Sequence, residues 1–373
     1  MMKRLFVLLF CLVNFISFSY AASKKISGEY YVELQSDRIN SVKGTNTNSK
    51  KVTNTFIEAK SQINLNLKDY LDINTSWSLH QVKSSLEKQG GFFKNEAIIL
   101  EGLNLKFSND EAELIIGKYN PNFALLWSKK LNSSIWGTDY AEEYQLVGKL
   151  GAKINAKINL EDYGNHIITV SSFFNDETGL EDTIITKSER GNGNIGQAGN
   201  SRGLSSYSLN IFGNNFYDYE GLFYNLSYQN VSPGNSSQKK DDQNGYSLTF
   251  GIDKYMLYNL KILPVIEYVK INNFNSVNYR FGPDFGDSQL PGNYEYLNML
   301  LILGYQSWAI NLNRLTKDIS TEIEKYKSNQ NEISIAYKFA NNLNFALGRK
   351  SSKNINDEQI VTFGAKLSLQ RKF

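Results

Sequence analysis

Residues 144–160 read YQLVGKLGAKINAKINL and alternate between apolar and polar side chains. One side of an extended chain here carries Tyr144, Leu146, Leu150, Ala152, Ile154, Ala156, Ile158 and Leu160. The other side carries mainly polar residues, including Lys149, Lys153, Asn155, Lys157 and Asn159. A helix would mix the two sets, whereas successive side chains of a strand point to opposite faces. The stretch therefore predicts a β-strand with one apolar and one polar face.

The same two-residue period recurs along the chain, clearly in residues 57–67 and 361–373. We expect strands near 26–36, 52–67, 70–80, 96–107, 111–118, 143–160, 165–174, 203–213, 218–230, 244–254, 259–272, 293–304, 305–316, 329–340, 341–350 and 358–373. About ten alternating residues per strand and an even strand number are typical of membrane barrels. The pattern predicts an all-β fold, a transmembrane antiparallel β-barrel of about sixteen strands.

The expected connections alternate between short turns and long loops. The turns lie near 68–69, 108–110, 161–165, 213–215, 254–258, 305–306 and 341–342, and many aromatic residues lie beside them. Short periplasmic turns, long extracellular loops and aromatic girdles are features of outer-membrane barrels. Pro264 interrupts the strand expected at 259–272, so we expect a bulge or a break there.

The N-terminus predicts export. Lys3 and Arg4 precede a short apolar run and small residues, which predicts a secretory signal peptide over residues 1–21, cleaved after Ala21. Residues 22–373 then form a single barrel domain. The only cysteine, Cys11, lies in the signal, so the mature chain has no thiol. The 373 residues have a formal net charge of +3, which gives no indication of a nucleic-acid partner.

The chain ends on Phe373 behind an alternating strand, and this resembles the terminal strand that outer-membrane barrels present to their insertion machinery. Arg371 departs from the apolar residue that usually stands two places earlier. With about sixteen strands, the whole mature chain resembles a Gram-negative porin of the general-diffusion type. The resemblance implies a homotrimer in outer-membrane lipid, assembled by the barrel-assembly machinery, through which small hydrophilic solutes and ions diffuse passively.

Residues 117–146 resemble the third loop of such porins, which folds into the lumen and narrows the channel. Phe123, Trp127 and Trp136 belong to an apolar set that is unsuited to a loop left in water, so we expect them to pack on the inner wall. Asp139, Glu142 and Glu143 form a compact acidic group after them. Opposite this group we expect cations at the constriction, with Lys60 and Lys366 as candidates.

Motifs for other chemistry are weak. Residues 191–196 match a GxGxxG pattern, but they lie in an expected loop rather than between a strand and a helix. His80 and His166 are far apart in the sequence, so no zinc site is indicated. No GxSxG-type nucleophile motif is present. The sequence predicts neither an enzyme nor a cofactor.

Three alternatives to a general-diffusion porin remain open. The barrel could be a substrate-specific uptake channel, although the inward positions show no ladder of aromatic or basic residues. It could be a surface-exposed structural or adhesive barrel that uses the long loop near 175–202. A soluble, secreted all-β protein is the last alternative.

Overall fold

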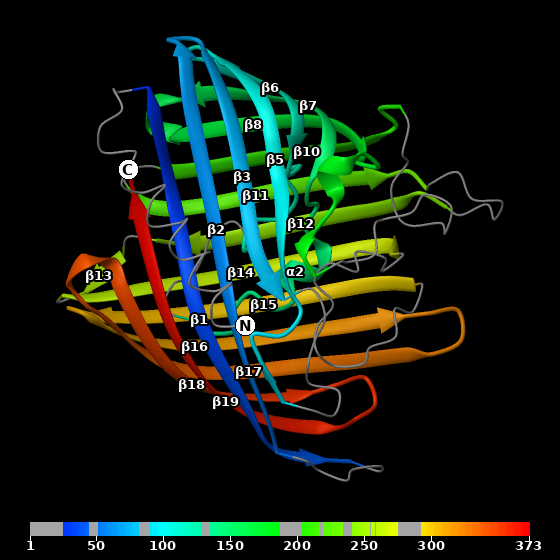
Figure 1. Ribbon diagram of the computed structural model, residues 1–373, viewed down its shortest axis with the longest axis vertical. Coiled ribbons are helices and arrows are strands. Elements are labelled where there is room, and N and C mark those ends of the chain that lie inside the picture. The colour runs from blue at the N-terminus through cyan, green and yellow to red at the C-terminus, as the bar shows by residue number, and fades with distance from the viewer. Residues whose placement is uncertain are drawn as a thin grey trace.

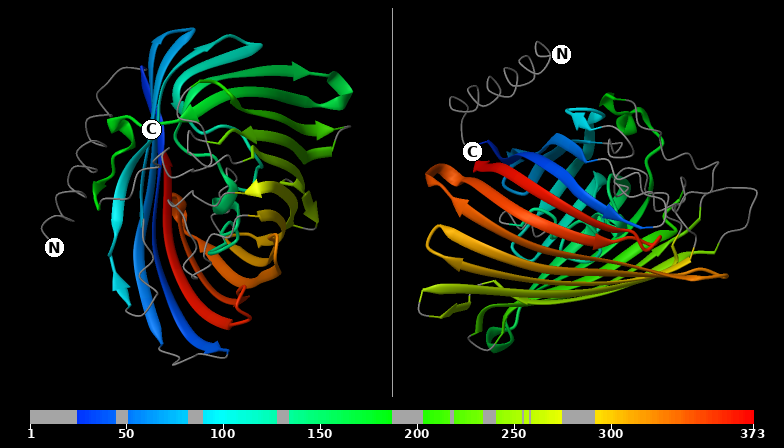
Figure 2. Two further views of the ribbon diagram at one scale, coloured as in Figure 1. Left: turned by 90° about the vertical axis from the view of Figure 1, so that its right-hand side faces the viewer. Right: turned by 90° about the horizontal axis from the view of Figure 1, so that it is seen from below.

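The computed structural model describes residues 25–44, 51–81, 90–127, 134–186, 203–216, 219–233, 241–253, 255–257, 259–274 and 292–373. The expected signal peptide, residues 1–21, and the 191–196 motif lie outside these residues. The described chain is almost entirely β-strand, and its strands form one strongly curved wall (Figure 1, Figure 2). No helix among the described residues is long and apolar enough to cross a membrane.

Sixteen strands form a closed antiparallel barrel, which confirms the expected fold. They are β1 (Ile26–Lys43), β2 (Val52–Lys68), β3 (Leu71–Gln81), β5 (Glu96–Ser108), β6 (Ala112–Tyr119), β7 (Lys149–Asn159), β8 (Asn165–Asn175), β10 (Ser206–Phe216), β11 (Tyr219–Val231), β12 (Gln243–Ile252), β14 (Leu260–Phe274), β15 (Gly292–Tyr305), β16 (Trp308–Ser320), β17 (Lys325–Lys338), β18 (Leu343–Lys353) and β19 (Gln359–Lys372). Three short strands are added, namely β4 (Gly91–Phe92), β9 (Ile184–Ile185) and β13 (Tyr255–Leu257). Short helices are α2 (Ala141–Tyr144), η1 (Glu161–Tyr163), η2 (Gly179–Glu181) and η4 (Ala340–Asn342).

The barrel closes where the first strand meets the last. β1 pairs with β19 from Glu29 opposite Lys372 to Lys43 opposite Gln359. Beyond the ladder, the backbones of Gly28 and Phe373 exchange two hydrogen bonds of 3.0 Å. A Cβ on Gly28 would clash with the Gln62 carbonyl oxygen and lie 2.8 Å from the Phe373 ring, so this close packing requires glycine. Closure leaves no unpaired edge, as a barrel in lipid requires.

The two faces of the wall carry opposite kinds of side chain. On β16, Ile310 and Leu312 lie exposed on the outside, while Asn311 and Asn313 are buried on the inside. This distribution inverts that of a soluble protein, because apolar side chains cover the outer surface.

Two regions differ from the expected strands. The strand expected at 143–160 begins only at Lys149, and Tyr144 and Leu146 are buried inside the barrel instead of facing outward. They do so because they belong to the apolar cluster that the third loop forms. Pro264 does not break its own strand, since β14 runs through it opposite Leu301. The interruption lies in the neighbouring strands, where β12 ends at Ile252 and β13 begins at Tyr255.

Several strands extend beyond their expected ends. β1 reaches Lys43, and only residues 321–324 separate β16 from β17. Polar residues at these strand ends continue the two-residue alternation beyond the apolar band. The backbone pairing of β1 with β19 and of β16 with β17 continues with it.

Candidate functional site: the third loop inside the barrel

The third loop joins β6 to β7 and lies inside the barrel, where Figure 2 shows its helix α2 within the ring of strands. Its described residues contact the inner wall over a wide arc. Contacts reach Ser227 on β11, Glu267 on β14, Lys317 on β16, Glu332 on β17 and Asp37 on β1. The loop therefore follows the inner wall across much of the circumference.

Glu267 holds the first half of the loop. Its Oε2 accepts hydrogen bonds from the backbone N–H groups of Leu125 at 2.8 Å and Leu126 at 3.0 Å. Thr249 Oγ1 donates to the same oxygen at 2.7 Å, and the Tyr144 hydroxyl donates to Oε1 at 2.5 Å. A buried carboxylate is stable only when its oxygens receive such donors. Glu267 thus joins both ends of the loop to β14.

Glu332 holds the tip of the loop in the same way. The backbone N–H groups of Ile135 and Trp136 donate to its two oxygens at 2.9 and 3.1 Å. The Ser134 hydroxyl donates to Oε2 at 3.0 Å, and Asn313 Nδ2 donates to the same oxygen at 2.8 Å. Because two backbone N–H groups of the loop donate to the Glu332 carboxylate, this attachment depends on the backbone conformation of the loop as well as on its side chains.

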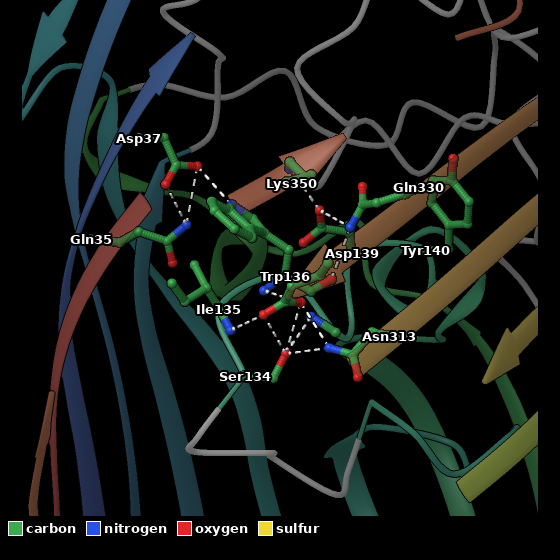
Figure 3. A network of polar contacts seen from close by, with 12 residues as sticks. Gln35, Asp37, Ser134, Ile135, Trp136, Asp139, Tyr140, Asn313, Gln330 and Lys350 are labelled. Atoms are coloured by element: carbon green, nitrogen blue, oxygen red, sulfur yellow. Dashed lines mark hydrogen bonds and ion pairs between the residues drawn. The ribbon is translucent and has the colours of Figure 1, made fainter. Parts of the chain in front are cut away.

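Trp136 adds a second attachment at the tip. Its indole Nε1 donates to Asp37 Oδ2 on β1 at 2.9 Å, and Gln35 Nε2 donates to Oδ1 of the same carboxylate at 3.0 Å (Figure 3). The ring is 2% exposed and packs with Ile135, Ala336 and Ala346.

Apolar residues of the loop pack inside the barrel. Phe123 and Trp136 are buried, and Trp127 is half-buried against the larger cluster. That cluster includes Leu126, Tyr140 and Tyr144 from the loop together with Val269, Tyr296 and Leu315 from the wall. The loop and the β14–β16 wall therefore share an apolar core.

Of the three expected acidic residues, two are paired with lysines of the wall. Asp139 Oδ2 lies 3.0 Å from Lys350 Nζ on β18 and accepts a hydrogen bond from Gln330 (Figure 3). Glu143 Oε1 lies 3.1 Å from Lys317 Nζ on β16, and the Tyr296 hydroxyl donates to its other oxygen at 2.9 Å.

Glu142 has a different environment. Its carboxylate forms no hydrogen bond or ion pair with another described residue, although its backbone N–H donates to the Thr138 carbonyl at 3.3 Å. Desolvation raises the pKa of Glu142 well above its ordinary value, and repulsion by Glu58 and Asp139 adds to the effect. Desolvation also raises the pKa of Asp139, although Lys350 opposes it.

The two expected cations do not pair with these acids. Lys60 Nζ lies 3.4 Å from the centre of the Trp127 ring, which is a cation–π contact. Lys366 Nζ donates to the backbone carbonyl of Ser134 and lies 3.8 Å from Glu33 Oε2. Both lysines therefore contact the loop, but Lys317 and Lys350 are the partners of its acidic residues.

Sequence reasoning missed five residues that hold the loop, namely Asp37, Glu267, Lys317, Glu332 and Lys350. Each lies at an inward position of a strand. Alternation could have placed Glu267, Glu332 and Lys350 inside, since the expected strands included them. It could not have shown which of the many inward polar residues the loop would reach.

A cavity of about 230 Å³ lies on the open side of the loop. Its polar lining includes Lys60, Gln62, Glu101 and Asn120, with Trp127 at the loop side. The two histidines lie elsewhere, His80 buried on β3 and His166 against the Tyr224 hydroxyl at 3.1 Å. Within the described residues, no group of three His, Cys, Asp or Glu is arranged to hold a metal.

No family model and no curated protein matches this sequence. Solved structures do match. The outer membrane channel DcaP of Acinetobacter baumannii has a TM-score of 0.54 at 10% identity, over 94% of this chain and 99% of that one. OmpF of Salmonella typhi, in complex with daunomycin, has a TM-score of 0.54 at 13% identity, over 92% and 97%. The anion-selective porin from Comamonas acidovorans has a TM-score of 0.50 at 9% identity, over 93% and 98%. At such identities the likeness is one of fold, and the chain has the closed sixteen-strand barrel fold of outer-membrane porins.

Proposed function

We propose that this chain is an outer-membrane porin through which small hydrophilic solutes and ions diffuse down their gradients. The single observation that carries the proposal is the inverted wall, with exposed apolar residues outside and buried polar residues inside a closed barrel. The cavity beside Lys60 and Trp127 supports a route between the third loop and the strands β2, β3 and β5. A channel of this kind needs no catalytic group.

The proposed location is the bacterial outer membrane. Exposed aromatic residues beside the short turns, such as Tyr305, Trp308 and Phe339, are suited to a membrane interface. Trp308 and Tyr337 pack edge to face with ring centres 4.8 Å apart on this outer surface. Export through a signal peptide cleaved after Ala21, assembly by the barrel-assembly machinery and a homotrimeric state complete the proposal.

The test is conductance of the mature chain, residues 22–373, in planar bilayers. We expect discrete, ohmic current steps in potassium chloride. A matched pair of variants probes the route: Gln62→Trp adds bulk to the cavity lining and should reduce the step size, whereas Tyr163→Trp at a short turn should not. Heat-modifiable protein that gives no steps would overturn the proposal.

A substrate-specific channel is the second candidate. The observation in its favour is the large apolar core that the loop shares with β14–β16, because it restricts passage to the opposite side of the lumen. Competition distinguishes the two candidates. A general-diffusion channel shows no saturable block by sugars or metal chelates, whereas a channel specific for one of these solutes shows saturable block by it.

A further inference from the structure

The barrel has a second cavity, of about 740 Å³, at the end that carries the short turns. Its lining comes from β14 to β19 and contains four cationic residues, Lys261, Lys338, Arg371 and Lys372, and no carboxylate. The amides of Asn342, Asn344 and Gln370 lie in the same lining. Neutral N–H donors are therefore available beside the positive charges.

Three of these cations are on the inner face. Alternation along β14 places Lys261 on the same side as buried Glu267, and alternation along β17 places Lys338 with Glu332. Lys372 likewise shares the inner side of β19 with Lys366. Ala309 and Ala336, which line the cavity, also pack with Ile135 and Trp136 of the third loop. The cavity therefore lies directly on the short-turn side of the loop tip.

On the other side of the lumen, the inward lysines at this end of the barrel form ion pairs with carboxylates. Lys106 Nζ lies 2.8 Å from Asp72 Oδ2, and Lys157 Nζ lies 2.9 Å from Glu113 Oε1. Lys261, Lys338 and Lys372 form no ion pair with any described residue. Glu29 is opposite Lys372 in the strand register, yet it forms no ion pair with it and lines the other cavity.

We propose that Lys261, Lys338 and Lys372 form a binding site for small oxyanions, such as inorganic phosphate and carboxylates, in the vestibule below the third loop. The field of three unneutralised ammonium groups in a concave wall attracts anions, and lysine binds phosphate as a compact point charge. Neighbouring amides complete the coordination of the oxygens. The role of the site in transport rests on the proposed channel function, whereas anion binding itself does not.

The first experiment measures block of the potassium chloride current by inorganic phosphate, added at the short-turn side. Wild-type channels should show saturable block. The triple variant Lys261→Gln/Lys338→Gln/Lys372→Gln should raise the half-blocking concentration at least tenfold. Increasing the salt from 0.1 to 1 M should weaken the block in the wild type, because these charges face water.

The control removes three positive charges from the outer wall. Arg314, Lys325 and Arg349 are at outward positions of β16, β17 and β18, and none of them lines this cavity. The variant Arg314→Gln/Lys325→Gln/Arg349→Gln should keep the wild-type half-blocking concentration. Equal block in both triple variants, or normal wild-type conductance without any block, would overturn the site.

A second measurement does not require conductance. The phosphorus-31 line of inorganic phosphate should broaden with wild-type protein folded in detergent and with the outer-wall control. It should not broaden with the inner triple variant. If the wild type conducts nothing but broadens the line, the channel proposal fails and the anion site stands. If wild type and inner triple variant broaden it equally, the anion site fails.

Discussion

The indole Nε1 of Trp136 donates a hydrogen bond of 2.9 Å to Oδ2 of Asp37. Trp136 belongs to the tip of the third loop, and Asp37 belongs to β1, next to the seam that β1 forms with β19. Lys366 on β19 binds the Ser134 carbonyl just before it. The loop is therefore attached to the pair of strands that closes the barrel, so its position and barrel closure are physically linked.

Replacing Trp136 by Phe removes this hydrogen bond while keeping most of the apolar packing. We expect a loss of about 1.5–3 kcal/mol in the free energy of unfolding, the usual worth of a hydrogen bond to a charged group. We also expect noisier open-channel current, because the loop tip has lost one attachment. Urea unfolding in detergent and single-channel recording measure the two effects. Trp308→Phe, on the exposed outer surface, is the control and should change neither.

Glu332→Ala should have a larger effect than Trp136→Phe. It leaves two buried backbone N–H groups and the Ser134 hydroxyl without the carboxylate that accepts their hydrogen bonds, whereas Asn313 Nδ2 keeps its hydrogen bond to Ser134 Oγ. Each unpaired buried donor costs about 1–3 kcal/mol, so the loop tip should detach from the wall. Single-channel conductance should then rise, while the strands remain folded by circular dichroism. Glu322→Ala, in the exposed turn after β16, should leave the conductance unchanged; unchanged conductance in Glu332→Ala as well would refute the anchoring role.

The barrel could be predicted from the sequence because its strands are specified by the alternation of neighbouring residues. Every strand must alternate apolar and polar residues to face lipid and water, and stretches such as 361–373 show that period directly. The alternation failed at Tyr144 and Leu146, which fit the period but belong to the core of the loop. A two-residue period specifies which side chains share a face only where the chain is extended.

The contacts of the third loop were not predictable, because they join residues far apart in the sequence. Nothing in the acidic group itself indicates that Asp139 binds Lys350 and that Glu143 binds Lys317. Lys60 contacts the Trp127 ring and Lys366 contacts the Ser134 carbonyl, so neither lysine pairs with the acidic group. The sequence predicts whether a side chain lies on the inner or the outer face of the wall. The conformation of the loop determines which residue that side chain contacts.

Lys60→Gln tests the proposed route past Trp127. Removing one positive charge from a lining that also contains Glu101 should make the cavity more negative. We expect the permeability ratio of potassium to chloride to rise about twofold to fivefold, which corresponds to roughly 0.5–1 kcal/mol of electrostatic energy in water. Reversal potentials in a salt gradient measure this ratio. Lys68→Gln at the end of β2 is the control; an equal rise in both variants would contradict the route.

The terminal residue has its own prediction. Phe373 exchanges two backbone hydrogen bonds with Gly28, and its ring lies against that glycine. If the side chain is the insertion signal, Phe373→Ala should reduce the heat-modifiable protein in outer membranes several-fold. The same variant should still refold in detergent, because its backbone bonds remain. Phe373→Tyr is the conservative control and should insert normally, so poor insertion of both variants would point to a different role.

In the proposed channel, Glu142 carries a pH-dependent charge. Because burial and the nearby Glu58 and Asp139 raise its pKa, Glu142 stays neutral to a higher pH than an ordinary glutamate and becomes negative on the alkaline side. Raising the pH through that range adds negative charge beside the lumen, so cation selectivity should increase with pH. Reversal potentials measured from pH 4.5 to pH 9 test this. In Glu142→Gln, cation selectivity should rise less with pH at pH values above the ordinary pKa of glutamate. Glu322→Gln should keep the wild-type pH dependence. If the selectivity of Glu142→Gln rises with pH as steeply as that of the wild type, another group is the one that titrates.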